Sequence, residues 1–366
     1  MIVKNEAHVI ARCLASVRPF VQQWLIVDTG SSDGTQDIVR HALQGVPGKL
    51  LERPWVDFAH NRTEALRLVP PDADYVLFID ADGELMADPG FQMPQLTHDA
   101  YDLEIRYAGL HYPFRQLVRR ALPWRYEGVL HEYLTGPAQF TNGGVLPGLW
   151  ILARHEGARS RDPETYRKDA AVLEAALRRE PDNSRYTFYL AQSLRDAGEL
   201  EQAVEWYARR VRMGGWREEV WFSLYQVAVL RERLGHPWPE VQDAYLMAYA
   251  YRPGRAEALY RVGMHHQKLG AYALSQLFLA QAARLPVPAD GLFVEHGIYA
   301  HHAVIETAVA EYYLGQHEAA LARYEALLRR SDLPPDIREL IARNQQFSWQ
   351  ALDSPAEGGA RGDSGR

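Results

Sequence analysis

The stretch Tyr75-Val76-Leu77-Phe78-Ile79-Asp80-Ala81-Asp82 decides the fold class of the N-terminal part of this chain. An apolar run rich in β-branched and aromatic residues leads directly into two carboxylates, which is typical of a buried strand that ends at a polar edge. Side chains two residues apart in a strand share a face, so Asp80 and Asp82 are expected to lie on one side. Two such carboxylates repel each other unless a cation or hydrogen-bond donors lie nearby, and Mg²⁺ or Mn²⁺ favours oxygen ligands. The stretch therefore predicts a metal site at a strand end.

A second apolar run ends in the same way. Leu25-Ile26-Val27 leads into Asp28-Thr29-Gly30-Ser31-Ser32-Asp33-Gly34-Thr35, and helix-like segments are expected over residues 6–17, 35–43 and 61–68. Alternating strands and helices predict an α/β sheet with parallel strands, whose ligands bind at the carboxyl ends of the strands. Asp28 is placed there to accept a hydrogen bond from a base or a ribose hydroxyl. Asp33 is expected to cap the helix that begins near Thr35.

From Asp162 onward the sequence indicates one helix after another, with a recurring spacing. Three sets share the offsets 0, 1, 8, 13 and 17: Leu190-Ala191, Gly198, Ala203 and Tyr207; Val262-Gly263, Gly270, Ser275 and Leu279; Thr307-Ala308, Gly315, Ala320 and Tyr324. The pattern resembles the tetratricopeptide repeat, a helix–turn–helix unit of about 34 residues. A fourth unit, residues 221–253, fits only with an insertion around residues 236–239. A leading helix over residues 162–179, with Asp162 as N-cap and Pro163 in its first position, completes the predicted superhelix.

The composition is that of a globular chain of two or three domains. It has 366 residues, with 47% hydrophobic and 24% charged residues. No apolar run approaches the roughly 20 residues of a membrane span, and residues 1–14 lack the apolar core of a signal peptide. A single cysteine, Cys13, excludes an internal disulfide framework and indicates a cytoplasmic location. The net charge of −7 argues against a globally basic nucleic-acid binder, although a local basic groove stays open.

Three motifs, in their order and spacing, resemble an inverting GT-A glycosyltransferase of family 2. They are Ile2-Val3-Lys4-Asn5-Glu6, the segment from Val27 to Thr35, and Phe78-Ile79-Asp80-Ala81-Asp82. The branch with a C-terminal tetratricopeptide region is the most similar, and it includes transferases related to bacterial peptide S-glycosylation and to lipopolysaccharide core synthesis. The resemblance implies an α/β GT-A (Rossmann-like) nucleotide-sugar domain over residues 1–160. An all-α tetratricopeptide-like superhelix over residues 161–350 would follow. The tail over residues 351–366 is rich in Gly, Ser, Ala and charged residues, and this composition predicts disorder.

The resemblance also implies roles for individual residues. Asn5 and Glu6 would help to hold the nucleotide, Asp28 would contact the base of a UDP-sugar or an equivalent donor, and Asp33 would support that loop. Asn61 and Arg62 would lie near the donor, with Arg62 paired with the diphosphate or with Asp80. Asp80 would approach the ribose and the metal, and Asp82 would ligate Mn²⁺ or Mg²⁺ directly.

An inverting transfer also needs a base that takes the acceptor proton. The resemblance places a His-Glu pair beyond the Asp-x-Asp motif, and Glu132 is the predicted base. His131 is its competitor, because the unperturbed pKa of histidine lies near neutrality. Trp124 and Tyr126 either form a wall for a sugar ring or pack in the core.

Histidines elsewhere in the chain divide into one candidate ligand and two pairs. His155 would complete the metal site or touch the diphosphate, and neutral imidazole suits Mn²⁺ better than Mg²⁺. The pairs His265-His266 and His301-His302 are adjacent on predicted helices and face different ways, so neither is interpreted as a metal site.

The acceptor is left open by the sequence. Helical repeats favour a peptide or protein, and a surface glycan or a modified nucleobase is the alternative. A non-catalytic nucleotide-sugar-binding adaptor is the other hypothesis, but a relic should lose its acidic strand ends, and Asp28, Asp80, Asp82 and Glu132 are all present. A nucleotidyltransferase is disfavoured, because no Gly-rich, basic loop follows the first strand. Thr29 departs from the second aspartate that many relatives carry. The tripeptide at 361–363, Arg-Gly-Asp, is interpreted as a chance occurrence.

Overall fold

The computed structural model describes residues 1–107 and 110–353, and the chain divides into two compact units, Met1–Pro181 and Asp182–Arg366. Most of the predicted tail, including the tripeptide at 361–363, lies outside the described residues. No helix in the described part is both long enough and apolar enough to cross a membrane.

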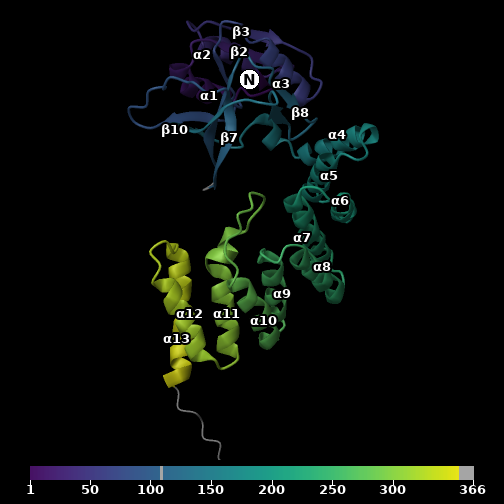
Figure 1. Cartoon of the computed structure of the whole chain (residues 1–366), viewed down its shortest axis with the longest axis vertical. Coiled ribbons are helices and arrows are strands. Elements are labelled where there is room, and N and C mark those ends of the chain that lie inside the picture. Colours follow the sequence, from purple (N-terminus) through teal and green to yellow (C-terminus); the bar gives the residue numbers. More distant parts are fainter. Residues whose placement is uncertain (108–109, 354–366) are drawn as a thin grey trace, which may run out of the picture. The chain divides into compact units, whose positions relative to one another are not determined.

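The N-terminal unit contains two sheets and a short hairpin (Figure 1). The first sheet is parallel, in the order β1 (Ile2–Val3), β2 (Trp24–Asp28), β3 (Gly48–Glu52). The second has the order β4-β7-β6-β10-β5, with bounds β4 (Tyr75–Leu77), β5 (Glu84–Ala87), β6 (Ala100–Tyr107), β7 (Leu110–Arg119) and β10 (Asn142–Leu152). The hairpin pairs β8 (Arg125–Glu127) with β9 (Tyr133–Thr135).

The strand that carries the Asp-x-Asp motif differs from the prediction in its pairing. The prediction of parallel strands is confirmed for β2, but β4 pairs with β7 in antiparallel fashion. Its regular pairing also ends at Leu77, although the amide of Phe78 still donates to the carbonyl of Gln116 at 2.7 Å. Asp80 and Asp82 therefore lie in the loop beyond the strand rather than at its last positions.

The helices of this unit begin where local hydrogen bonds allow. α1 (Ile10–Val17) starts four residues later than expected, because Asn5 has a left-handed backbone (φ 58°) and the carbonyl of Glu6 accepts from the amides of Val9 and Ile10. α3 (Phe58–Arg67) starts three residues earlier than expected, because Asp57 caps it by accepting from the amide of His60 at 2.7 Å. α2 (Thr35–Ala42) agrees with the prediction.

The leading helix of the repeat region is shorter than expected. α4 runs over Thr165–Arg179, after the 3₁₀ turn η2 (Ala158–Arg161). The prediction that Asp162 is the N-cap and Pro163 the first helical residue was wrong. The side chain of Asp162 accepts a hydrogen bond from the amide of Glu164 and so closes a turn before the helix. Another 3₁₀ turn, η1 (Arg18–Phe20), follows α1.

One hydrophobic core joins the two sheets of the N-terminal unit. It includes Val3 and Ile26 of the parallel sheet, Leu14 of α1, and Leu103 and Leu149 of the five-stranded sheet. A cavity of about 870 Å³ is lined by residues of β1, β2, β4 and α3, and it extends to Arg62 and Tyr126. The core thus fixes the strand ends from which the site is built.

The second unit is a succession of helix pairs (Figure 1). Its elements are α5 (Ser184–Asp196), α6 (Leu200–Met213), α7 (Arg217–Arg233), α8 (Trp238–Tyr251), α9 (Glu257–Lys268), α10 (Tyr272–Ala283), η3 (Ile298–His302), α11 (Ala303–Tyr313), α12 (His317–Leu328) and α13 (Pro335–Asp353). Within each of the four pairs from α5 to α12, the two helices pack against each other. The predicted insertion around residues 236–239 corresponds to the turn between α7 and α8.

The positions with recurring offsets lie at the helix crossings. Ala203, Ser275 and Ala320 are fully buried, and Tyr207, Leu279 and Tyr324 are buried beside them. A methyl group at Gly263 would come 2.6 Å from Cγ of Leu279, so the crossing of α9 and α10 requires a glycine there. Small residues allow these helices to approach closely, which explains the spacing seen in the sequence.

Candidate active site

Asp28 ends β2 and organises the turn that follows it. Its Oδ1 accepts from the amides of Gly30 at 2.9 Å and Ser31 at 2.8 Å, and the residue is fully buried. Burial acts to raise the pKa of Asp28, but the hydrogen bonds from Ser31 and Gly30 outweigh it and hold the pKa below its usual value. The second oxygen, Oδ2, is buried and accepts no hydrogen bond from the described residues. The structure thus shows Asp28 holding the turn, and its contact with a base stays a prediction.

The loop after β1 is interlocked with the loop after β2. The amide of Asn5 donates to Ser31 Oγ and its Oδ1 accepts from the amide of Ser32, both at 2.9 Å. The amide of Glu6 donates to Thr35 Oγ1 at 2.8 Å. Because these bonds cross between two strand ends, they hold Asn5 and Glu6 at the carboxyl edge of the parallel sheet.

Asp33 has a double role in the same loop pair. Its Oδ2 accepts from the amide of Ala7 at 3.0 Å, and its Oδ1 accepts from both the amide and the hydroxyl of Thr35. Gly34, with a left-handed backbone, occupies the N-cap position of α2, so the expectation that Asp33 is the N-cap residue was wrong by one position. These bonds tie Asp33 to both loops, and its role toward a nucleotide stays a prediction.

Arg62 joins two carboxylates that are distant in sequence. Its Nη2 donates to Asp80 Oδ1 at 2.7 Å, and its Nε lies 2.6 Å from Glu132 Oε1. Arg62 comes from α3, Asp80 from the loop after β4, and Glu132 from the segment before β9. The guanidinium holds the pKa of Asp80 below its usual value. Burial acts to lower the pKa of Arg62, but the negative charges of Asp80 and Glu132 outweigh burial and raise the pKa above its usual value.

Glu6 and Asp82 meet at the start of η2. Asp82 Oδ2 accepts from the amide of Gly157 at 3.1 Å, and Glu6 Oε2 accepts from the amide of Ala158 at 3.1 Å. A Cβ at Gly157 would lie 3.3 Å from Asp82 Oδ2 and 3.4 Å from the Glu6 carboxylate oxygens, so both acids crowd that glycine. Burial raises the pKa of Glu6, opposed by the Ala158 amide and reinforced by the charge of Asp82.

His155 lies next to this acidic edge but not as a preformed ligand. Its ring stacks on Tyr107 with centroids 4.0 Å apart, its backbone is left-handed (φ 53°), and its side chain is exposed. His155 precedes Gly157, whose amide donates to Asp82 Oδ2, by two residues.

The carboxylates of Asp80 and Asp82 are the candidate ligands of a divalent cation. Among residues 1–107 and 110–353, no three His, Cys, Asp or Glu side chains are grouped so that they could hold a metal ion. Asp80 and Asp82 each use one carboxylate oxygen in the bonds described above. Such carboxylates fit Mg²⁺ or Mn²⁺ when substrate phosphate and water supply the remaining ligands. Binding by Asp80, Asp82 and His155 together is a prediction that no contact in the structure tests.

Several predicted site residues have structural partners. Asn61 is fully buried, and it accepts from the amide of Val56 and donates to the carbonyl of Pro54, both at 2.9 Å. Trp124 is a core residue that packs on Phe140 with ring centroids 5.0 Å apart. Tyr126 lies under the Arg62 guanidinium, 5.6 Å from its ring centroid, and burial raises the pKa of its hydroxyl. His131 is exposed and has a left-handed backbone (φ 50°).

The sequence interpretation missed the amides of Gly157 and Ala158 and the hydroxyls of Ser31 and Thr35. The hydroxyls stand inside the segment 28–35 and were visible there as candidate donors and acceptors. The amides carried no signal, because any residue except proline has one and only the fold brings η2 to Glu6 and Asp82.

Comparison with known proteins agrees with this architecture. Residues 1–132 match the family model for glycosyl transferase family 2, and residues 167–214 match a tetratricopeptide repeat model. A TPR repeat-containing protein of Synechococcus elongatus is 28% identical over 254 residues, which is 64% of this chain and 61% of that protein. The SPbeta prophage-derived glycosyltransferase SunS of Bacillus subtilis is 22% identical over 227 residues, 58% of this chain and 52% of SunS.

Shorter and weaker similarities accompany these two. A glycosyltransferase of Rickettsia felis is 35% identical over 85 residues, 23% of this chain and 28% of that protein. The crystal structure of MamA covers 50% of this chain and 95% of its own at 16% identity, with a TM-score of 0.37. The chain thus spans about half to three fifths of the length of these two relatives. It is similar to glycosyl transferase family 2 over residues 1–132 and to tetratricopeptide repeats over residues 167–214.

Proposed function

We propose that the N-terminal unit transfers a sugar from a nucleoside diphosphate sugar, most simply a UDP-sugar, to an acceptor hydroxyl, thiol or amine with inversion at the anomeric carbon. The observation that carries the proposal is the single guanidinium of Arg62, which contacts both Asp80 and Glu132. A donor-side carboxylate and a base candidate are thereby held within the span of one side chain.

The chain's own residues supply most of the required chemistry. Glu132, ion-paired and mostly buried, takes the proton of the attacking acceptor group as its new bond to the anomeric carbon forms. The bond from that carbon to the diphosphate oxygen breaks, and the diphosphate leaves with the electron pair. Asn5, Glu6, Asp28 and Asp33 shape the nucleotide side of the site through the interlocked loops. A divalent cation at Asp80 and Asp82 would neutralise the leaving diphosphate as a Lewis acid.

The acceptor belongs to the proposal as well. Tetratricopeptide superhelices present extended surfaces suited to polypeptides, which favours a peptide or protein acceptor positioned by the second unit, with a surface glycan as the alternative. A reducing compartment such as the cytoplasm suits a chain whose one cysteine, Cys13, is buried, with burial raising the pKa of its thiol to about 12.

The test is turnover of a panel of nucleotide sugars in the presence of Mn²⁺, followed by release of the nucleoside diphosphate. Asp82→Asn keeps an acceptor oxygen for the Gly157 amide but removes the charge, and it should lower turnover by about 100-fold or more. Asp88→Asn, an exposed change in the same unit, is the matched control and should leave turnover unchanged. If no donor turns over, and Asp82→Asn behaves like Asp88→Asn, sugar transfer is refuted. A nucleotide-sugar-binding adaptor is then the remaining function when a donor still binds.

A further inference from the structure

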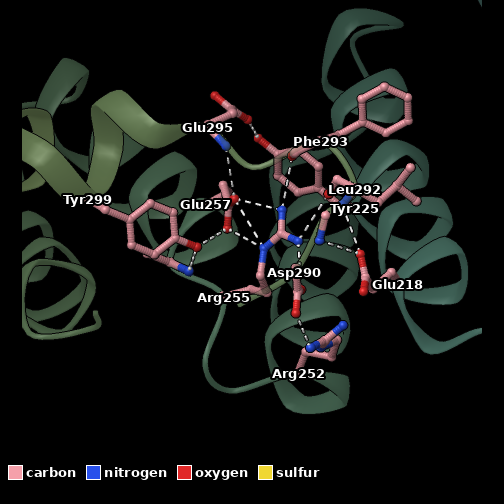
Figure 2. Close-up of polar contacts among 12 residues, drawn as sticks. Glu218, Tyr225, Arg252, Arg255, Glu257, Asp290, Leu292, Phe293, Glu295 and Tyr299 are labelled. Carbon is pink, nitrogen blue, oxygen red and sulfur yellow. Dashed lines mark hydrogen bonds and ion pairs between the residues drawn. The ribbon is translucent and has the colours of Figure 1, made fainter. Parts of the chain in front are cut away.

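The connection between α10 and α11 is held on the helices by contacts of residues 290–295. We call residues 285–297 the strap. Figure 2 shows its contacts with α7, with the turn before α9 and with α9 itself. Glu218, Phe222 and Tyr225 lie on one face of α7, at spacings of four and three residues, and the strap lies against this face.

A buried arginine holds the centre of the strap. Arg255, 1% exposed, contacts Asp290 Oδ2 with Nη1 at 3.0 Å and donates from Nη2 to the carbonyl of Phe293, also at 3.0 Å. Arg252 pairs with the other oxygen of Asp290 at 2.5 Å. Glu257, fully buried, shares the guanidinium of Arg255. The carboxylate of Asp290 therefore forms ion pairs with two arginines, Arg252 and Arg255, of the turn before α9.

Residues of the strap on either side of this arginine contact make further contacts with α7 and α9 through backbone amides, a carboxylate and an aromatic ring. Glu218 Oε2 accepts from the amides of Gly291 at 3.0 Å and Leu292 at 2.8 Å. The ring of Phe293 lies against Phe222, with centroids 4.4 Å apart. Glu295 accepts from Tyr225 at 2.6 Å and pairs with Arg261 at 2.9 Å.

These contacts have the character of a peptide bound to a receptor. Side chains of the helices and of the turn before α9 contact successive groups of the strap: backbone amides, backbone carbonyls, two carboxylates and one aromatic ring. The surface contributes Arg252, Arg255 and Arg261 beside two carboxylates, Glu218 and Glu257. Each strap carboxylate, Asp290 and Glu295, pairs with an arginine of this surface. Phe293 has a left-handed backbone (φ 47°), a strained conformation for a bulky residue, and its side chain is 49% exposed.

We infer that α7, the turn before α9 and α9 form a peptide-binding surface that the strap occupies within the same chain. The partner that fits this surface is an extended segment of the pattern Asp-x-x-Phe-x-Glu, the order in which Asp290, Phe293 and Glu295 engage it. A polypeptide of this kind binds where the strap now lies and displaces it. The inference rests on the contacts of the second unit and does not depend on sugar transfer.

The test uses the full chain and a fluorescent peptide with the sequence of residues 285–297. In the wild type the tethered strap has an effective concentration of about millimolar and excludes the free peptide. The double variant Asp290→Ala/Phe293→Ala should bind the peptide at least about ten-fold more tightly than the wild type, measured by fluorescence anisotropy. Asp290→Asn alone, which keeps the shape of the side chain, is the second variant should the double variant not fold.

Controls separate this result from a general loosening of the protein. Asp332→Asn removes an exposed partner of Arg330 in the same unit and should leave peptide binding at the wild-type level. A scrambled peptide should bind no variant. Hydrogen exchange in the wild type should show protection of the Gly291 and Leu292 amides, and this protection should fall in Asp290→Asn. Equal peptide affinity for the wild type and both strap variants, equal binding of the scrambled peptide, or unprotected amides in the wild type would each overturn the inference.

Discussion

Replacing Glu132 by glutamine is the sharpest test of the proposed chemistry. The change keeps the size of the side chain and removes its charge, and with it the ability to take a proton. Glu132 Oε1 lies 2.6 Å from Arg62 Nε, and the two side chains are 13% and 18% exposed. General base catalysis typically contributes about 10²–10⁴-fold, so kcat should fall by about that factor. The KM for the donor should change little, because the base acts on the acceptor.

The stability cost of the same change follows from the geometry. Exposed ion pairs contribute up to about 1 kcal/mol, and breaking a buried pair costs about 3–5 kcal/mol. The Glu132–Arg62 pair lies between these limits, and Arg62 keeps Asp80 as a partner, so we expect the free energy of unfolding to fall by about 1–3 kcal/mol. A protein that loses this much remains folded at room temperature if it has ordinary stability.

The assay is donor hydrolysis with water as acceptor, alongside urea denaturation of the same samples. Glu127→Gln is the matched control, since Glu127 is a neighbouring carboxylate on β8 paired with Arg125 at the surface. If Glu132→Gln keeps kcat within about ten-fold of the wild type, Glu132 is not the base. His131→Asn then tests the competitor, with asparagine chosen because residue 131 has a left-handed backbone that asparagine tolerates.

Three further predictions concern other parts of the chain. Folding lowers the pKa of Asp28, so its carboxylate stabilises the fold above the ordinary carboxyl pKa, and this contribution is lost as the pH falls through the pKa of the folded state. The difference in free energy of unfolding between the wild type and Asp28→Asn, measured by urea denaturation, should therefore shrink below about pH 4. If the difference is the same at pH 3 and pH 7, the carboxylate is not what stabilises the turn. Gly263→Ala places a methyl group against Leu279 and should lower the free energy of unfolding by about 1–3 kcal/mol. In the control Gly254→Ala the methyl group meets no atom within 4 Å, so the free energy of unfolding should change by less than about 0.5 kcal/mol. Thermal melts of both variants measure the difference. Removing divalent cations with a chelator should abolish donor-induced stabilisation, and Mn²⁺ should bind measurably by calorimetry only together with a nucleoside diphosphate, since the described residues offer no preformed set of three ligands. Tight Mn²⁺ binding by the protein alone would contradict this.

The α/β character of the N-terminal unit was accessible from the sequence, whereas the roles of the candidate residues stay predictions. Apolar runs that end in acidic residues mark strand ends, and the carboxyl ends of neighbouring parallel strands meet at one edge. That reasoning placed Asp28 correctly at the end of β2. The strand before Asp80 was expected to be parallel, and this was wrong, because β4 pairs in antiparallel fashion with β7, a strand more than 30 residues further along the chain.

The repeats were accessible for a related reason. Small residues at fixed offsets are demanded by close helix crossings, and this demand recurs in every unit, so it leaves a periodic trace in the sequence. The strap leaves no such trace, because it interrupts the period between α10 and α11.

The sequence by itself determined the two kinds of architecture and the acidic strand ends, because both follow from local patterns that repeat or alternate. Only the tertiary structure decided that Arg62 joins Asp80 to Glu132, that the amides of η2 meet Glu6 and Asp82, and that the strap lies on α7 and α9. Each of these contacts joins residues far apart in the chain. A carboxylate, an amide or an arginine has many compatible partners, and packing of the whole core selects among them.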